Sequence, residues 1–292
     1  MAGTEAPKVH VITDSSADIP SETARQLGIQ VVPLTIFFGD QPFRDGEEIT
    51  TEQFYARMRA EGDVVPRTSQ PSPADFAAAY RRVPPDSPIV VVTISSALSG
   101  TYQSARIACE EFPGRDITVI DGRVVAYLTG QAVVACAEKA AAGASREEVV
   151  ATARDRLSRI GVVFTVATLE YFVKNGRIGK AQGFVGAMLN IKPLLSLENG
   201  LVVPVERVRG QRQALERMVA LVQERLAGQP AEAFYIVDAD NAADAAGVEA
   251  RLRGLYPSVP VSHFALGPVV GCHAGPGTVG LAYLRAKPEH GG

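Results

Sequence analysis

Short apolar runs alternate with amphipathic stretches along the first half of this 292-residue chain. The runs Val9–Thr13, Val31–Phe38, Ile89–Ile94 and Ile117–Asp121 predict strands, because β-branched runs bounded by proline and polar residues are typical of buried strands. Helices are predicted between and after these runs, over Pro20–Leu27, Thr51–Ala60, Pro73–Arg82, Ser99–Glu110 and Val124–Ala142. This alternation predicts an α/β fold in which helices cover both faces of a mostly parallel sheet.

Local signals set several of these boundaries. Gly28 marks the C-terminal end of the first helix, where glycine is the preferred residue. Ser72 is the expected N-cap of the third helix, with Pro73 in its first turn and Asp75 completing a capping box. The preceding segment, Arg67–Pro71, is polar and is expected to be a loop.

The sequence pattern changes near residue 158 from helical to β-rich. A helix capped by Ser145 is expected over Arg146–Ser158, and the following segment Gly161–Thr168 is apolar and rich in β-formers. Residues 1–158 are therefore expected to form an N-terminal α/β domain, and residues 159–292 a C-terminal mixed α/β domain.

The second half combines a hairpin with further strand and helix signals. Leu194–Leu197 and Leu201–Val205 flank the turn sequence Asn199-Gly200, which predicts a β-hairpin. The remaining expected elements are helices over Arg212–Ala227 and Ala242–Leu255 and strands over Ala233–Val237 and Val261–Leu266.

Composition excludes several classes of protein. The net charge is −3 and no basic run is present, so a nucleic-acid-binding protein is not expected. No uninterrupted apolar segment approaches 18 residues and no secretory signal is visible, so no membrane insertion is expected. Cys109, Cys136 and Cys272 lack ligand-like spacing, which argues against disulfides or a metal site and favours a cytoplasmic protein.

Paired hydroxyls are the most informative chemical feature. Ser95 and Ser96 come between the strand Ile89–Ile94 and the helix that follows it. Free backbone N–H groups and the positive end of the helix dipole make such a turn an anion-binding site. Two further hydroxyl pairs are expected at strand ends, Ser15-Ser16 after Asp14 and Thr68-Ser69. A single pair is more commonly a helix cap or turn former, and the pairs indicate a binding site only when taken together.

His273 lies within the glycine-rich sequence GCHAGPG. The flanking glycines predict a loop in which the backbone approaches a ligand closely, and a solvent-exposed loop histidine is the alternative. The spacing Gly275-Pro-Gly-Thr-Val-Gly280 matches G-x-G-x-x-G, but no βαβ unit follows it. No P-loop is present either, so the chain shows no nucleotide site of its own.

Two other functions fit the same residues. A serine esterase or thioesterase would use Ser96 and His273, although the flanking glycines of a nucleophile elbow are missing. A ligand-responsive regulatory module is the third alternative.

Six segments together resemble the DegV family: VITDSSADIP, RTSQPSPADF, ISSALSGTYQSA, TLEYFVKNGRIGK, MLNIKPLL and HAGPGTVGLAY. They occur in order over nearly the whole chain. The resemblance implies a two-domain α/β protein that binds one long-chain fatty acid between its domains and needs no cofactor. It also implies the fatty-acid-binding subunit of a bacterial fatty acid kinase, which presents the carboxylate to a separate ATP-binding subunit that makes acyl phosphate. The chain alone would then not be an enzyme.

The resemblance also assigns residues. Thr68 and Ser96 would bind the carboxylate together with His273, and the adjacent hydroxyls of Ser69 and Ser95 are further candidates. Arg177 would take part in docking the kinase subunit.

The other expectations from the resemblance concern the acyl chain and one loop. The segments Gly161–Leu169 and Gly183–Leu197 are expected to line the acyl chain. The sequence Asp121-Gly122-Arg123 departs from the Asp-Ser found in many members, which leaves the shape of that loop open. The preferred acyl chain, the identity of the kinase and the oligomeric state are not predicted.

Overall fold

The computed structural model describes residues 8–62, 64–186 and 190–287. The chain forms two compact units. Unit 1 contains residues 1–36, 42–48 and 68–158, and unit 2 contains residues 37–41, 49–67 and 159–292. The predicted N-terminal domain of residues 1–158 therefore includes two stretches that the structure groups with unit 2.

Unit 1 is built on a parallel sheet with the strand order β2-β1-β6-β7. All five residues of the central strand β6 are buried, as expected for a parallel strand covered on both faces. The strands are β1 (His10–Asp14), β2 (Gln30–Val32), β6 (Ile89–Thr93) and β7 (Ile117–Asp121). The predicted parallel sheet is thus confirmed.

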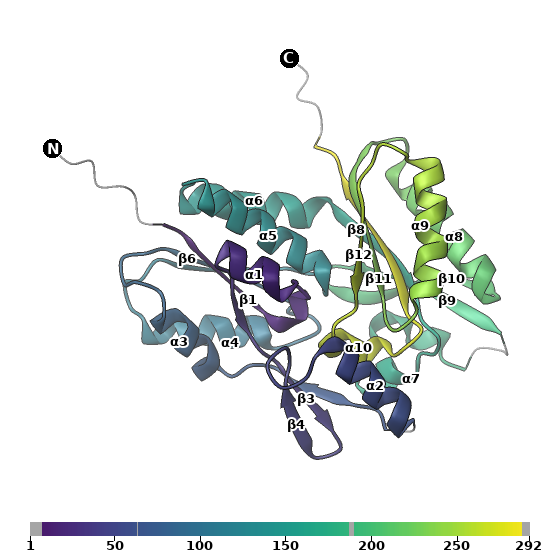
Figure 1. Cartoon of the computed structure of the whole chain (residues 1–292), viewed down its shortest axis with the longest axis horizontal. Coiled ribbons are helices and arrows are strands. Elements are labelled where there is room, and N and C mark those ends of the chain that lie inside the picture. The colour runs from purple at the N-terminus through teal and green to yellow at the C-terminus, as the bar shows by residue number, and fades with distance from the viewer. Residues whose placement is uncertain (1–7, 63, 187–189, 288–292) are drawn as a thin grey trace. The chain divides into compact units, whose positions relative to one another are not determined.

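Helices cover both faces of this sheet (Figure 1). On one face, α1, α5 and α6 bury a cluster around Val90, Val92 and Val133. On the other face, α3 and α4 bury a cluster around Val91, Phe76 and Tyr80. The helices are α1 (Ser21–Leu27), α3 (Pro73–Arg81), α4 (Thr101–Ala108), α5 (Tyr127–Ala141) and α6 (Arg146–Arg159).

The predicted helix signals are also confirmed. Gly28 ends α1 in the left-handed conformation. Ser72 and Asp75 form the capping box of α3. At α6, the Glu148 N–H donates to Ser145 Oγ, and the Ser145 N–H donates to Glu148 Oε2. By contrast, the N-cap residues Gly100 of α4 and Ala126 of α5 supply no side-chain cap, although the Thr101 N–H at the start of α4 donates to Ser99 Oγ at 3.4 Å.

Unit 2 contains a six-stranded mixed sheet with the order β10-β9-β8-β13-β11-β12, in which only the pair β11–β12 is parallel. The predicted hairpin around Asn199-Gly200 is confirmed as β9–β10. The strands are β8 (Ile160–Thr165), β9 (Ile191–Glu198), β10 (Leu201–Arg209), β11 (Ala231–Asp238), β12 (Val261–Ala265) and β13 (Val279–Arg285).

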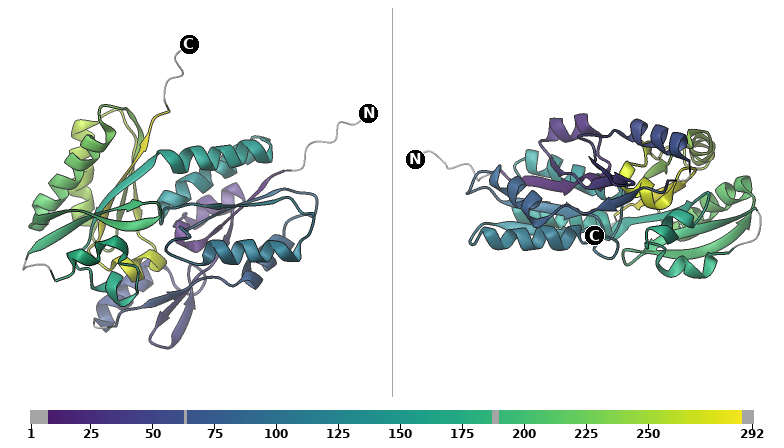
Figure 2. Two further views of the ribbon diagram at one scale, coloured as in Figure 1. Left: turned by 180° about the vertical axis from the view of Figure 1, so that it is seen from behind. Right: turned by 90° about the horizontal axis from the view of Figure 1, so that it is seen from below.

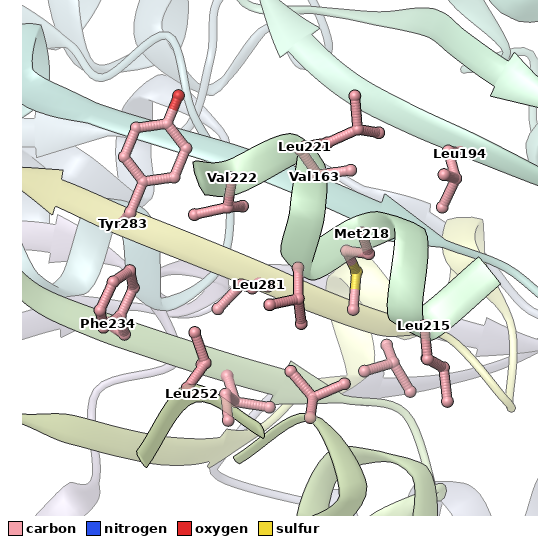
Figure 3. Close-up of a cluster of buried hydrophobic side chains, with 14 of the residues drawn as sticks. Val163, Leu194, Leu215, Met218, Leu221, Val222, Phe234, Leu252, Leu281 and Tyr283 are labelled. Atoms are coloured by element: carbon pink, nitrogen blue, oxygen red, sulfur yellow. The ribbon is translucent and has the colours of Figure 1, made fainter. Parts of the chain in front are cut away.

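The core of unit 2 lies between this sheet and the helices α8 (Gln211–Leu226) and α9 (Ala242–Leu255). Met218 from α8, Leu252 from α9 and Leu281 from β13 are fully buried there (Figure 3). Figure 2 shows these elements from behind and from below. No helix in the described part of the chain has both the length and the hydropathy required to span a bilayer.

Several elements differ from the sequence prediction. The run Val31–Phe38 divides into β2 and a separate strand β3 (Thr35–Phe38). The segment expected to be a polar loop, Arg67–Pro71, contains β5 (Arg67–Ser69), which joins β3 and β4 (Gln41–Arg44) in a small sheet of order β4-β3-β5. Short elements without a periodic pattern were not predicted. They are α7 (Glu170–Lys174), the 3-10 helix η3 (Gly179–Phe184), α10 (Pro268–Ala274) and β13.

Candidate functional site

The loops that follow β1, β6 and β7 emerge at one edge of the parallel sheet, because these three strands run in the same direction. In open α/β sheets, ligands bind at the carboxyl ends of the strands. Ser15-Ser16, Ser95-Ser96 and Asp121 therefore belong to one region of unit 1.

Asp14 joins two of these loops. Its Oδ1 accepts hydrogen bonds from the N–H and the hydroxyl of Ser16, and its Oδ2 accepts from the Ile94 N–H at 2.9 Å. The side chain is completely buried. This burial raises the pKa of Asp14, although the hydrogen bonds from Ser16 and Ile94 lower it. Asp14 thus fixes the start of the loop that carries Ser95 and Ser96.

A second buried carboxylate, Asp45, lies beside the same loops. Burial raises the pKa of Asp45 to about 7; the hydrogen bond with Ser15 lowers this pKa, and the negative charge of Asp14 raises it further. The Ser15 hydroxyl also accepts a hydrogen bond from the Leu34 N–H at 3.0 Å. Sequence reasoning identified Ser15 and Ser16 but missed Asp45, which lies outside any recognisable motif.

The two serines of the β6–α4 loop have different surroundings. Ser95 is buried, and its N–H donates to the Val124 carbonyl at 3.0 Å. Its Oγ accepts a hydrogen bond from the Ala97 N–H. Ser96 is exposed, so of the two predicted residues it is the more accessible to a ligand.

Ser96 is hydrogen-bonded to Asp121, the last residue of β7. The Ser96 N–H donates to Asp121 Oδ1 at 2.9 Å, and the Ser96 hydroxyl donates to Asp121 Oδ2 at 2.5 Å. The Arg123 N–H also donates to Oδ1, at 3.1 Å. Sequence reasoning singled out this loop for its departure from the family pattern but assigned Asp121 no role.

The segment that carries Thr68 and Ser69 lies near the N-terminus of α4. Gln70 Nε2 donates to Ser104 Oγ at 3.3 Å, and the Gln70 side chain fills the space over Gly100, where a Cβ atom would lie 2.3 Å from Gln70 Oε1. Thr68 is half-buried and Ser69 is exposed. The predicted hydroxyl segments Thr68-Ser69 and Ser95-Ser96 therefore both flank the beginning of α4.

His273 lies in α10 of unit 2, so the predicted glycine-rich loop is wrong at this position. The glycines on either side act through close packing. A Cβ at Gly271 would lie 2.6 Å from the hydroxyl of Tyr55, and a Cβ at Gly275 would lie 2.3 Å from the ring of Tyr171. Gly275 also has a φ of +77°, which favours glycine where α10 ends.

The imidazole of His273 is uncharged near neutral pH. Burial lowers the pKa of His273 to about 4, and the positive charge of Arg177 lowers it further. His273 can therefore donate one hydrogen bond from a neutral ring, but it brings no positive charge to a ligand. The structure thus brings two predicted residues, His273 and Arg177, within electrostatic range of each other.

Asn175 holds the segments around His273 and Arg177 in place. The Asn175 side-chain Nδ2 donates to the Cys272 carbonyl at 2.9 Å and to the Pro66 carbonyl at 3.1 Å. The backbone carbonyl of Asn175 accepts a hydrogen bond from Arg177 Nη1 at 2.7 Å. Sequence reasoning missed this role because the three segments are far apart in the chain.

Unit 2 also contains a cavity of about 460 Å³. Its apolar lining includes Ala167, Leu169, Phe184, Val185 and Ile191, and its polar lining includes Glu170, Lys174 and Arg207. Much of the apolar lining falls within the two segments expected to contact an acyl chain. Residues 187–189 of these segments, which include the start of the MLNIKPLL motif, lie outside the described residues.

Among residues 8–62, 64–186 and 190–287, no group of three His, Cys, Asp or Glu side chains could hold a metal ion. The polar groups described at the sheet edge include hydroxyls, backbone N–H groups and carboxylates. Hydroxyls and N–H groups at the start of a helix suit an anionic ligand.

The fold and these residues define a two-unit α/β protein with serine hydroxyls and carboxylates at the edge of a parallel sheet. The chain belongs to the DegV family, because the model of this family, described as an uncharacterised protein family, matches residues 8–286.

Relatives and solved structures agree with this assignment. A DegV domain-containing protein of Deinococcus radiodurans is 38% identical over 276 residues, which cover 94% of this chain and 97% of the relative. The structure of a DegV family protein from Thermus thermophilus, described as fatty acid binding, is 35% identical, with a TM-score of 0.86 and coverage of 96% of this chain and 100% of that one. DegV of Bacillus subtilis, described as a fatty acid binding protein, is 28% identical, with a TM-score of 0.85 and coverage of 96% and 100%.

Proposed function

We propose that this protein binds a long-chain fatty acid and presents the carboxylate to a separate ATP-binding kinase subunit, which converts it to acyl phosphate. The observation that carries fatty acid binding is the similarity to the Thermus thermophilus protein, which is described as fatty acid binding and matches this chain over 96% of its length. The step to a kinase subunit rests on the segments that resemble the family's kinase-associated members. The cytoplasm is the proposed location.

We propose that Thr68 and Ser96 bind the carboxylate, with His273 as a third partner and Ser69 and Ser95 as neighbouring polar groups. The hydroxyls flank the N-terminus of α4, whose N-cap residue Gly100 supplies no side chain, and N–H groups and the helix dipole favour an anion there. Because the His273 ring is neutral, this residue supplies one hydrogen-bond donor and no positive charge.

The acyl chain would supply most of the affinity. About 0.8 kcal/mol per buried methylene gives about 11 kcal/mol for about fourteen methylenes, before the costs of association. The apolar lining of the unit 2 cavity supports the assignment of residues 161–169 and 183–197 to the chain-binding region.

The first experiment is extraction of the purified protein with organic solvent followed by mass spectrometry. We expect about one equivalent of a long-chain fatty acid, because a buried acyl chain dissociates slowly. The matched variants are Ser96→Ala at the proposed head-group site and Ser87→Ala at a buried serine elsewhere in unit 1. Weaker binding of added palmitate is expected only in the first, and an unloaded wild-type protein that also fails to bind added palmitate would contradict the proposal.

The kinase role and the esterase alternative are tested with the loaded protein. Acyl phosphate, trapped as the hydroxamate, should form only with ATP and the ATP-binding subunit. Arg177→Glu should lower this yield while fatty acid remains bound, because Arg177 is the proposed docking residue. Turnover of p-nitrophenyl esters that is abolished by Ser96→Ala would instead support an esterase.

A further inference from the structure

The hydroxyl proposed to bind the ligand already has an acceptor. Asp121 Oδ2 lies 2.5 Å from Ser96 Oγ, while Asp121 Oδ1 accepts the backbone N–H groups of Ser96 and Arg123. The two oxygens of this carboxylate thus have different roles. Oδ1 accepts backbone N–H groups from two loops, and Oδ2 accepts the Ser96 hydroxyl.

A serine hydroxyl has one hydrogen and can donate to one acceptor at a time. If the Ser96 proton points at Asp121, a ligand carboxylate at the same hydroxyl meets only oxygen lone pairs. The two carboxylates would also repel each other. A counter-charge, Arg123 Nε, is 3.9 Å from Asp121 Oδ2, and the Arg123 side chain is 70% exposed, so solvent weakens its effect.

We infer that Asp121 is a positioning residue that holds the Ser96 hydroxyl and competes with the ligand carboxylate for its proton. This inference rests on the proposed function. Binding of a fatty acid then requires the hydroxyl to turn from Asp121 to the ligand, while Oδ1 keeps the loop in place through the backbone. The Asp121 carboxylate thus weakens binding of the ligand head group, and this favours release of the acyl group after it has been modified.

Asp121→Asn tests this competition. The asparagine Oδ1 can still accept the two backbone N–H groups, while its Nδ2 donates to Ser96 Oγ and forces the hydroxyl proton toward the ligand. The negative charge is also removed. Because a hydrogen bond to a charged group contributes more than a neutral one, we expect palmitate to bind the delipidated variant about tenfold more tightly in calorimetric titration.

The gain should depend on Ser96. We therefore expect Asp121→Asn to give a clearly smaller increase in affinity when Ser96→Ala is already present, because only the relief of charge repulsion then remains. Glu110→Gln is the matched control, because it removes one exposed carboxylate just beyond α4 in the same unit, and its affinity for palmitate should equal that of the wild type. Unchanged or weaker binding by Asp121→Asn, or an equal gain without Ser96, would overturn the inference.

A second variant and an unfolding measurement also test the contact between Ser96 and Asp121. Asp121→Ser, which removes the charge but keeps a polar acceptor, replaces Asp121→Asn if the latter does not fold, and should also tighten binding. In ligand-free protein, the effects of Ser96→Ala and Asp121→Asn on unfolding should be non-additive, and additive effects would refute the contact. A wild-type protein that binds no palmitate would instead refute the proposed function.

Discussion

Three aspartate carboxylates accept hydrogen bonds from serines in unit 1. Asp14, Asp45 and Asp121 all lie near the carboxyl ends of the parallel strands, and each is paired with a serine. The sequence identified the serines, because paired hydroxyls after an apolar run form a recognisable pattern. It did not identify their acceptors, because Ser96 and Asp121 meet only through the parallel pairing of β6 with β7. The roles of Thr68, Ser96 and His273 in ligand binding stay predictions.

Replacement of Asp45 by asparagine should stabilise the protein at alkaline pH. The folded pKa of Asp45 is about 7, above the ordinary value of 3.8, so the folded protein holds this proton more tightly than the unfolded chain. Stability from this group is therefore present below about pH 4 and lost as the pH rises to about 7, by about 4 kcal/mol. Asp45→Asn removes this loss, because asparagine is neutral at every pH.

Urea unfolding at pH 5 and pH 8 measures this effect. The advantage of Asp45→Asn over the wild type should be a few kcal/mol at pH 8 and clearly smaller at pH 5. Asp86→Asn, at an exposed position of the same unit, should show little difference at either pH. An equal effect of Asp45→Asn at both pH values would contradict the raised pKa.

Elements with a strong periodic pattern were predictable, and short elements held by distant neighbours were not. The bounds of α9, Ala242–Leu255, agree with the prediction, and the capping box of α3 forms as expected. By contrast, α10 contains a glycine in a helix of seven residues, which is unfavourable locally. It forms because Gly271 packs against Tyr55, more than 200 positions earlier in the chain.

The backbone of Ala126, in the loop between β7 and α5, is strained beside the candidate site. Ala126 has a φ of 55° and a ψ of −153°, a region that is essentially restricted to glycine. Its neighbour Val124 accepts the N–H of Ser95, and Gly122 donates to Thr93. These hydrogen bonds hold the loop against β6, so the strain is retained where Ser95 and Asp121 are positioned.

Ala126→Gly should therefore stabilise the protein. Relief of the strain, about 1–3 kcal/mol, exceeds the added flexibility of glycine, about 0.5–1 kcal/mol, so the free energy of unfolding should rise by about 1 kcal/mol. Ala137→Gly, at a buried position within α5, should instead lower it by about 1 kcal/mol or more. Denaturant unfolding measures both, and destabilisation by both substitutions would show that Ala126 is not strained.

At the scale of the whole molecule, the order of strands and helices predicted the two types of sheet, but not the path of the chain. Residues 37–41 and 49–67 leave the first unit and belong to the second. Helix α2 (Thr51–Glu61) illustrates why this was not predictable. Its capping box is readable from the sequence, whereas the bond from the Tyr55 hydroxyl to the Leu266 carbonyl, at 2.8 Å, joins segments 211 positions apart.

Ligand binding should stabilise this fold in a way that depends on the carboxylate. A ligand that binds only the folded protein adds about 2.7 kcal/mol at a hundredfold excess over its dissociation constant. For a chain of this size, each kcal/mol raises the melting temperature by about 2–4 °C, so excess palmitate should raise it by about 5–10 °C in the delipidated protein.

Methyl palmitate has the same chain but no charged head group. If the hydroxyls at the start of α4 bind a carboxylate, the methyl ester should give a clearly smaller shift, measured by differential scanning fluorimetry. Equal shifts for both compounds would mean that the acyl chain alone is recognised and that the serine cluster has another role.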